Sequence, residues 1–302
     1  MTDDESDRPS ASILRPPRWA THPANSAVVD WGALSHAGSA SAVNTESFFV
    51  GRYDRTLEPV LASVPQAAGT SWHHDAGFLA LLADGIHPDA PGEVASRTAI
   101  QTLLELAVET PDWIMRYDDP TLIEQVKRRI VSRLRLVDQL LSSMGVAIGH
   151  DDALAASVTI LAVLPPDGIV AHVGRSRAYL QRAGALTRLT RDHTAAQAFA
   201  EAGVDRTLAH HPNKDVLMRA VGFGDERLVV DMDHFTMEPG DRVTLCSDGL
   251  ADAVSDDDLA EILTSSASSA IACRTLVDRA LAVGVRENVT VIVGRVPPAV
   301  TR

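Results

Sequence analysis

Cysteine is rare in this sequence and long hydrophobic runs are missing from it, which excludes several classes of protein. The 302 residues include two cysteines, Cys246 and Cys273, which lack the close spacing of metal-binding pairs. A disulfide framework is therefore not expected, as is usual in a reducing compartment. No apolar run reaches the roughly 18 residues of a membrane span, and the acidic start MTDDESDRPSAS is unlike a secretory signal. We therefore expect a cytoplasmic protein with no membrane partner.

Positive charge is also scarce, with 27 Lys and Arg against 40 Asp and Glu and a formal net charge of −13. Nucleic-acid binding needs a clustered basic surface, so nucleic acid is not expected as a partner. An acidic surplus is compatible with binding divalent cations, which take carboxylate oxygens as ligands. Hydrophobic residues make up 45% of the chain and charged residues 22%, as in a globular protein with a substantial core.

The sequence divides into a polar arm and one domain. Residues 1–28 are rich in Asp, Ser, Pro and Arg and lack periodicity, which predicts a disordered N-terminal arm. Residues 29–302 contain no linker or repeat and are expected to form a single domain. Apolar segments predict strands at 47–53, 77–85, 157–164, 168–174, 176–182, 185–190, 227–235, 241–249 and 288–296. Helical periodicity and capping signals predict helices at 92–108, 121–144, 256–263 and 272–283.

The order of these elements predicts an α+β fold. Strands outnumber helices, and two long helices occur together near the middle of the chain. We therefore expect two packed antiparallel sheets flanked by helices, a four-layer α-β-β-α sandwich. The second helix also carries a basic cluster beside its apolar stripe, made of Lys127, Arg128, Arg129, Arg133 and Arg135. A solvated helix face and an anionic docking site are both open interpretations of this cluster, and we favour the first.

Two predicted strands run directly into an Asp-Gly pair, Asp84-Gly85 and Asp248-Gly249. Asp-Gly is a common turn former, so each aspartate is either a turn residue or a metal ligand at the end of a strand. Two such strands could bring two carboxylates to one rim of a sandwich. Close carboxylates repel unless they are protonated or bridged by cations, which makes a site for hard divalent metals plausible.

Four segments resemble, in order, the motifs of the metal-dependent protein phosphatase (PPM, type 2C) family, and together they cover about residues 33–297. The segments are FLALLADGIHPDAPGEVAS (78–96), IVAHVGRSRAYLQRAGALTRLTRDHTAAQ (169–197), GDRVTLCSDGLADAVSDDDLAEIL (240–263) and RENVTVIVGRV (286–296). They are similar to the family's ADGMGG…GE.AS, VGDSRAYL..G.L..LT.DH, SDGL.D.VSD and DNVT segments. Each match is weak alone, but the ordered set identifies the chain as a bacterial member of the family.

The resemblance implies a serine/threonine phosphatase that binds two Mg²⁺ or Mn²⁺ ions between its sheets. A water shared by the ions attacks phosphoserine or phosphothreonine directly in such enzymes. By the same resemblance, Asp84 bridges both ions, Gly85 offers its backbone carbonyl, and Asp248 and Glu287 complete the ligands of one metal. Asp84 and Asp248 are thus the expected catalytic residues. The expected partner is a phosphorylated protein, such as a Ser/Thr kinase or its target, by analogy alone.

Several positions depart from the family pattern. The motif R..NED stands here as Ser41 to Glu46, so a bidentate phosphate-binding arginine has become Ser41 and an acid has become Thr45. Glu46 remains a candidate metal ligand. Glu287 replaces an aspartate, a change that Mn²⁺ is expected to tolerate better than Mg²⁺. Histidines at 73, 74 and 87 are more simply surface-loop residues than replacement ligands, and His193 is expected to be structural or close to the substrate.

Arg175 replaces the aspartate that helps to hold a third, weaker metal in bacterial members of the family. We therefore expect this third site to be lost, since a guanidinium does not bind a cation. Three roles for Arg175 remain open: a solvated arginine at a strand end, a ligand for the substrate phosphate, and an internal counter-ion that pairs with Asp248.

Two functions remain open from the sequence. The first is an active, divergent Ser/Thr phosphatase, and it is favoured because Asp84, Gly85 and Asp248 are retained. The alternative is a weakened or inactive pseudophosphatase that binds phosphoproteins or other partners as a regulator.

Overall fold

The computed structural model describes residues 29–40, 43–53, 57–62, 77–86, 91–109, 121–148, 154–164, 166–203, 215–224 and 228–297. The predicted arm (1–28), Ser41, the histidines at 73 and 74, and His87 lie outside these residues. None of the helices within the described ranges is both long and apolar enough to cross a membrane.

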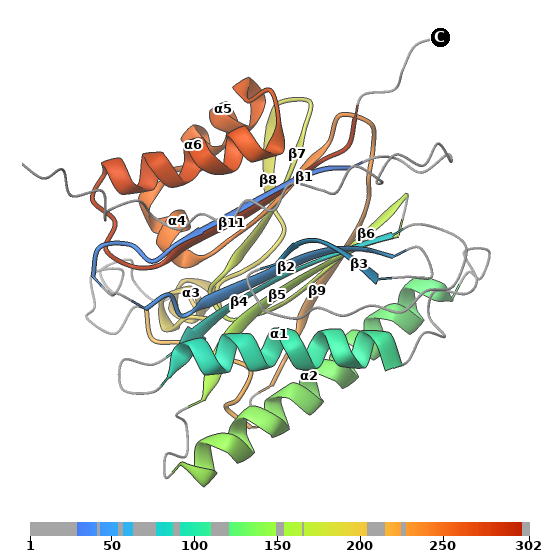
Figure 1. Cartoon of the computed structure of the whole chain (residues 1–302), viewed down its shortest axis with the longest axis vertical. Coiled ribbons are helices and arrows are strands. Elements are labelled where there is room, and N and C mark those ends of the chain that lie inside the picture. The colour runs from blue at the N-terminus through green and yellow to red at the C-terminus, as the bar shows by residue number, and fades with distance from the viewer. Residues whose placement is uncertain are drawn as a thin grey trace, which may run out of the picture.

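Two antiparallel sheets form the centre of the molecule (Figure 1). The first sheet has the order β1 (Asp30–His36), β11 (Val289–Arg295), β10 (Arg242–Cys246), β7 (Arg177–Arg182) and β8 (Ala185–Arg188). The second sheet has the order β3 (Leu57–Ala62), β2 (Glu46–Tyr53), β4 (Gly77–Ile86), β5 (Ala155–Leu164), β6 (Asp167–Val173) and β9 (Asp231–Thr236). Every pair of neighbouring strands in these two orders is antiparallel, as predicted.

Helices cover the outer face of each sheet, so the predicted four-layer α+β sandwich is confirmed (Figure 1). The long helices α1 (Gly92–Glu109) and α2 (Leu122–Ala147) pack on the second sheet. The helices α4 (Asp248–Ala253), α5 (Asp256–Ser265) and α6 (Ser269–Ala282) pack on the first sheet. A short helix, α3 (Ala195–Glu201), follows β8 in the chain.

Strand β4 shows how the sequence specifies these layers. It is apolar along most of its length because both of its faces are buried. Leu79, Leu81 and Ala83 face the helices, whereas the alternate residues Phe78 and Ala80 face the other sheet. This alternation follows from the two-residue period of a strand. It carries the chain straight from the core to Asp84 at the end of the sheet.

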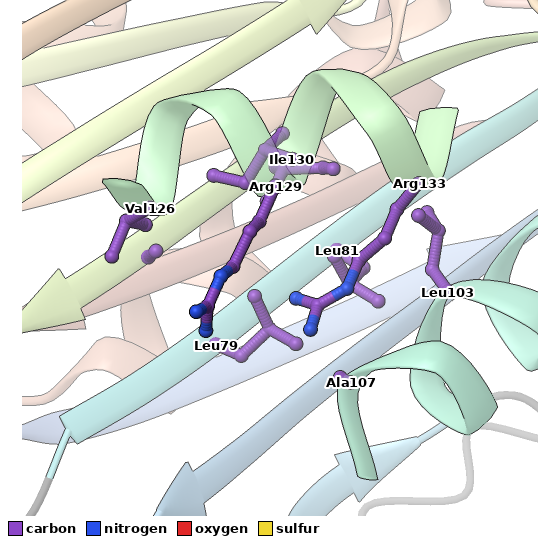
Figure 2. A pocket seen from close by; sticks show the side chains of 10 residues that line it. Leu79, Leu81, Leu103, Ala107, Val126, Arg129, Ile130 and Arg133 are labelled. Atoms are coloured by element: carbon purple, nitrogen blue, oxygen red, sulfur yellow. The ribbon is translucent and has the colours of Figure 1, made fainter. Parts of the chain in front are cut away.

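Helix α2 follows its predicted apolar stripe, since Val126, Ile130, Leu134, Val137 and Leu141 are all buried. The prediction for its basic cluster needs a correction. Among the cluster, Arg128 and Arg135 are exposed, but Arg129 and Arg133 extend over a small apolar pocket between α1, α2 and β4 (Figure 2). Long arginine stems can cover apolar surface in this way, and in Arg129 the Nη1 atom is itself buried.

Four elements were not predicted, namely β1, β3, α3 and α4, and several element ends differ; the strand predicted at 227–235, for example, is β9 and begins at Asp231. The strands β1 and β3 and the short helix α3 gave no clear period; in β1 only three of seven residues are buried. The strand predicted at 241–249 ends at Cys246, and Asp248 is the first residue of α4. Ser247 therefore lies in the connection between β10 and α4. Its backbone N–H donates to the Thr290 carbonyl oxygen (3.0 Å).

Candidate metal centre

The first two acids of the site face each other across two neighbouring strands. Glu46 is the first residue of β2, and its direct partner in β4 is Asp84. Cross-strand partners project from the same face of a sheet, and two like charges in this position destabilise it. A pair of acids here therefore needs a proton or a cation between them.

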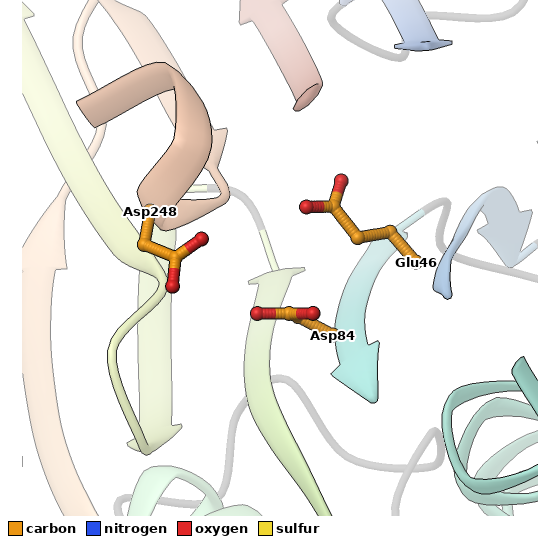
Figure 3. Close-up of side chains that lie close together, drawn as sticks. All are labelled: Glu46, Asp84 and Asp248. Carbon is orange, nitrogen blue, oxygen red and sulfur yellow. The ribbon is translucent and has the colours of Figure 1, made fainter. Parts of the chain in front are cut away.

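A third carboxylate, Asp248, reaches the pair from the other sheet. One oxygen from each of Glu46, Asp84 and Asp248 lies within 4.8 Å of the other two. The three side chains point toward one another from separate elements (Figure 3). Glu46 and Asp248 are only 5% and 8% exposed, so water screens this cluster poorly. We call these residues the carboxylate cluster.

Burial and mutual repulsion raise the proton affinity of the cluster. Burial, reinforced by Asp248, raises the pKa of Glu46 to about 8. Burial also raises the pKa of Asp84 well above its ordinary value, and the charges of Asp248 and Glu46 add to the effect. The Oε2 atom of Glu46 is buried and makes no hydrogen bond. An oxygen-only cluster with an unpartnered buried oxygen has the composition that Mg²⁺ and Mn²⁺ take as ligands, so these residues fit such an ion.

Hydrogen bonds join the residues just before β2 to Asn288, which comes just before β11, and they fix Glu46 in place. The backbone N–H and the hydroxyl of Thr45 both donate to the Asn288 side-chain oxygen (2.9 and 2.8 Å). The Asn44 side-chain oxygen accepts the backbone N–H of Glu46 (3.0 Å). Thr45, which replaces an acid of the family pattern, therefore has a structural role here. Nothing in the sequence pointed to Asn288 as its partner.

The remaining predicted ligands lie next to the cluster. Gly85 lines the cleft at the end of β4, where a Cβ atom would overlap the carbonyl group of Gly92 at the start of α1. Glu287 lies at the rim with its side chain 65% exposed, and it is not part of the carboxylate cluster. Its carboxylate is 3.9 Å from the guanidinium of Arg175.

Arg175 lies inside the site. Its Nε and Nη2 atoms both contact Oδ2 of Asp248. Its side chain is 19% exposed, which does not fit the interpretation as a solvated arginine. The nearby Asp215, which sequence reasoning missed, is 3.9 Å from Nη1. No motif marked Asp215, because only the fold brings its segment to this end of the sheets.

His193 and His172 support the loop that carries Arg175. The Nδ1 atom of His193 accepts the backbone N–H of Gly174 (3.1 Å), and its Nε2 lies 3.2 Å from Asp231. His172 Nε2 donates to the Gly174 carbonyl oxygen (3.0 Å). Burial lowers the pKa of His172 to about 3, and burial also lowers the pKa of His193 below its ordinary value. His193 is structural in this arrangement, and sequence reasoning missed His172.

The cluster opens into a cleft of about 880 Å³. Its lining includes the charged residues Arg286 and Glu93 and the apolar residues Val216, Leu217 and Phe223. A phosphorylated side chain is small compared with this volume. The cleft therefore gives a ligand access to the acids.

Known proteins share both the sequence pattern and the fold. Residues 63–283 match the family model described as protein phosphatase 2C. The chain is 34% identical to the serine/threonine protein phosphatase PstP of Mycobacterium tuberculosis over 222 residues, 72% of this chain but only 40% of PstP. It is 29% identical to the protein phosphatase PhpP of Streptococcus pneumoniae over 216 residues, 70% of this chain and 82% of PhpP.

The fold of PstP is similar as well. A crystal structure of M. tuberculosis PstP gives a TM-score of 0.68 at 26% identity and covers 89% of this chain and 99% of that chain. The catalytic domain of PstP in complex with two manganese ions gives a TM-score of 0.66 at 26% identity, covering 89% of this chain and 98% of that chain. By its sequence pattern and its fold, the chain belongs to the protein phosphatase 2C family.

Proposed function

We propose that this chain is a metal-dependent protein Ser/Thr phosphatase whose metal centre is built on the carboxylate cluster. The observation that carries the proposal is the convergence of Glu46, Asp84 and Asp248 from two sheets at the end of an open cleft. The relatives named above are Ser/Thr or protein phosphatases. The structure of PstP with two manganese ions supports Mn²⁺ or Mg²⁺ as the cofactor here.

Charge explains why a phosphatase of this design needs a metal. A phosphate ester is an anion, and acids in a poorly solvated site repel it strongly. Bound Mn²⁺ or Mg²⁺ would neutralise the phosphoryl charge and activate a water for attack. Asp84, Glu46 and Asp248 would together hold such an ion with their carboxylate oxygens. Glu287 and Gly85 line the same cleft. The Glu287 carboxylate and the backbone carbonyl of Gly85 are further candidate ligands of the metal.

The proposed substrate is a phosphoserine or phosphothreonine side chain of another protein, such as a Ser/Thr kinase or a target of one. The cleft can admit such a side chain, and Arg286 at its edge adds positive charge. We further propose that residues 29–302 form the phosphatase domain and that it acts in the cytoplasm. The pairing of β1 with β11 supports a domain that begins before Asp30.

Turnover of a phosphothreonine peptide tests the proposal. We expect hydrolysis that requires added Mn²⁺ and stops with a chelator, because the cluster cannot receive a phosphate without cations. Asp248→Asn is expected to lower kcat by about 10²-fold or more, since an amide supplies no charge to the site. Initial rates of phosphate release, with para-nitrophenyl phosphate as a second substrate, measure both effects. Wild-type chain without turnover at millimolar Mn²⁺ would refute the proposal.

One contact favours a second candidate function. Because Arg175 pairs with Asp248, the chain could instead bind phosphoproteins without hydrolysing them. This pseudophosphatase would bind the phosphothreonine peptide in a fluorescence titration yet release no phosphate from it.

A further inference from the structure

The guanidinium of Arg175 occupies one flank of the metal centre. It contacts Oδ2 of Asp248 through two of its nitrogens. The other oxygen of this carboxylate, Oδ1, accepts the backbone N–H of Gly249 (2.6 Å). Both oxygens of Asp248 are therefore engaged by N–H groups. A cation that takes Oδ2 of Asp248 as a ligand therefore has to compete with Arg175 for that oxygen.

The acids around Arg175 come from separate parts of the chain. Asp248 begins α4, Glu287 precedes β11, and Asp215 lies in the segment 215–224. The carboxylates of Glu287 and Asp215 are each 3.9 Å from a guanidinium nitrogen. Carboxylates gathered from several elements around one point are the arrangement expected for a bound cation. Here the cation at that point is an arginine side chain, which stays charged at any ordinary pH.

The backbone before Arg175 is held firmly. Gly174 has a φ of +120°, and a Cβ atom there would overlap Ser157, so only glycine fits. The N–H and C=O groups of Gly174 are both bonded to His193, with the carbonyl oxygen also accepting from His172. The N–H of Arg175 donates to the Ser157 hydroxyl (3.2 Å). Such a fixed backbone lowers the entropy cost of placing the guanidinium on Asp248.

We propose that Arg175 is a built-in cation that takes the place of one divalent ion. The chain then holds one Mn²⁺ tightly, on the Glu46 and Asp84 side of the carboxylate cluster, while the guanidinium neutralises Asp248 and the acids beside it. This inference rests on the metal centre of the proposed function, but it concerns the number of ions and not turnover. A second Mn²⁺ binds only as Arg175 is displaced, and so binds weakly.

Mn²⁺ titration of the chelator-treated full chain tests this inference. Calorimetry should give one Mn²⁺ per wild-type chain, and electron paramagnetic resonance should show an isolated ion. Arg175→Gln, which removes the charge and keeps much of the side-chain length, should bind a second Mn²⁺ at least about tenfold more tightly than wild type. Its spectrum should show spin coupling, because paired metals in such centres lie about 3.5–4 Å apart.

Arg286→Gln is the matched control, since Arg286 lines the same cleft and its loss removes the same charge. We expect this variant to keep the wild-type count of one ion. Two ions on wild-type chain, with the affinity of Arg175→Gln, would overturn the inference and leave the phosphatase proposal standing. If both variants gained the same affinity for a second Mn²⁺, the gain would come from losing a positive charge anywhere in the cleft. That result would also overturn the inference. Absence of Mn²⁺ binding in all three chains would overturn both proposals.

The number of Mn²⁺ ions bound per wild-type chain is measured without any variant. The inference therefore stays testable even if Arg175→Gln folds poorly. Arg175→Lys provides a further check, because lysine keeps the charge but lacks the planar fork that contacts Asp248. Its second-ion affinity should lie between those of wild type and Arg175→Gln. If Arg175 instead binds the substrate phosphate, Arg175→Gln would raise KM for the phosphopeptide and leave the Mn²⁺ count unchanged, which contradicts the inference.

Discussion

Asp84→Asn is expected to abolish Mn²⁺ binding and to lower kcat by at least about 10³-fold, because the bound metal supplies several kcal/mol of transition-state stabilisation. Asp84 lies opposite Glu46 in the sheet, and one of its oxygens lies within 4.8 Å of an oxygen of Glu46 and of an oxygen of Asp248. An asparagine keeps the shape of the side chain but has no charge to hold a divalent ion. Calorimetric Mn²⁺ titration and initial rates on a phosphothreonine peptide measure the two effects.

The same substitution at Asp233 serves as the control for Asp84→Asn. Asp233 is an exposed residue of β9 and has no part in the carboxylate cluster. Asp233→Asn should therefore bind Mn²⁺ and turn over substrate as wild type does. If Asp84→Asn bound Mn²⁺ with wild-type affinity, the metal would have to bind at another site.

Glu46→Gln is expected to stabilise the metal-free protein at alkaline pH. The pKa of Glu46 is raised from 4.5 to about 8 by its burial and by Asp248. The folded chain therefore binds a proton more tightly than the unfolded chain does, and the stability linked to this proton is lost as pH rises through that window. Glutamine is neutral at every pH and removes this loss. At about pH 9 we expect a melting temperature higher by roughly 4 °C or more.

Thermal unfolding in chelator at about pH 5 and about pH 9 measures this effect. The wild-type melting temperature should fall more steeply with pH than that of Glu46→Gln. The same variant should lose most of the stabilisation that Mn²⁺ gives to wild type, because one ligand is gone. Glu93→Gln is the control, since Glu93 lines the cleft outside the carboxylate cluster. Equal pH slopes for wild type and Glu46→Gln would show that Glu46 is not a buried, repelled acid.

Most of the fold could be predicted because its buried elements have strong periods. The stripe of α2 and the apolar run of β4 both give an unambiguous pattern. Strand β1 gave none, since its burial depends on pairing with β11 at the far end of the chain. The end of β10 was misplaced for a related reason: the hydrogen bonds of Ser247 to Thr290 that close the strand are set by tertiary contacts.

In the candidate site, too, a local sequence pattern marks some residues, while only the fold brings in the others. Asp84 and Asp248 each stand in a local Asp-Gly pattern that can be seen in the sequence. Asp215 and Asn288 have no such pattern, and they reach the site only through the pairing of distant segments. The sequence also showed that Arg175 departs from the family pattern, but it left three roles open. Its contact with Asp248 depends on how β7 and β10 pair, which a local pattern cannot reveal.

A crystal structure of the full chain soaked in Mn²⁺ tests the metal centre most directly. Anomalous scattering locates manganese without reference to any assay of activity. We expect a strong peak between the carboxylates of Glu46 and Asp84, with the guanidinium of Arg175 still on Asp248. A map with no peak at these carboxylates at saturating Mn²⁺ would contradict the assignment of the cluster as a metal centre.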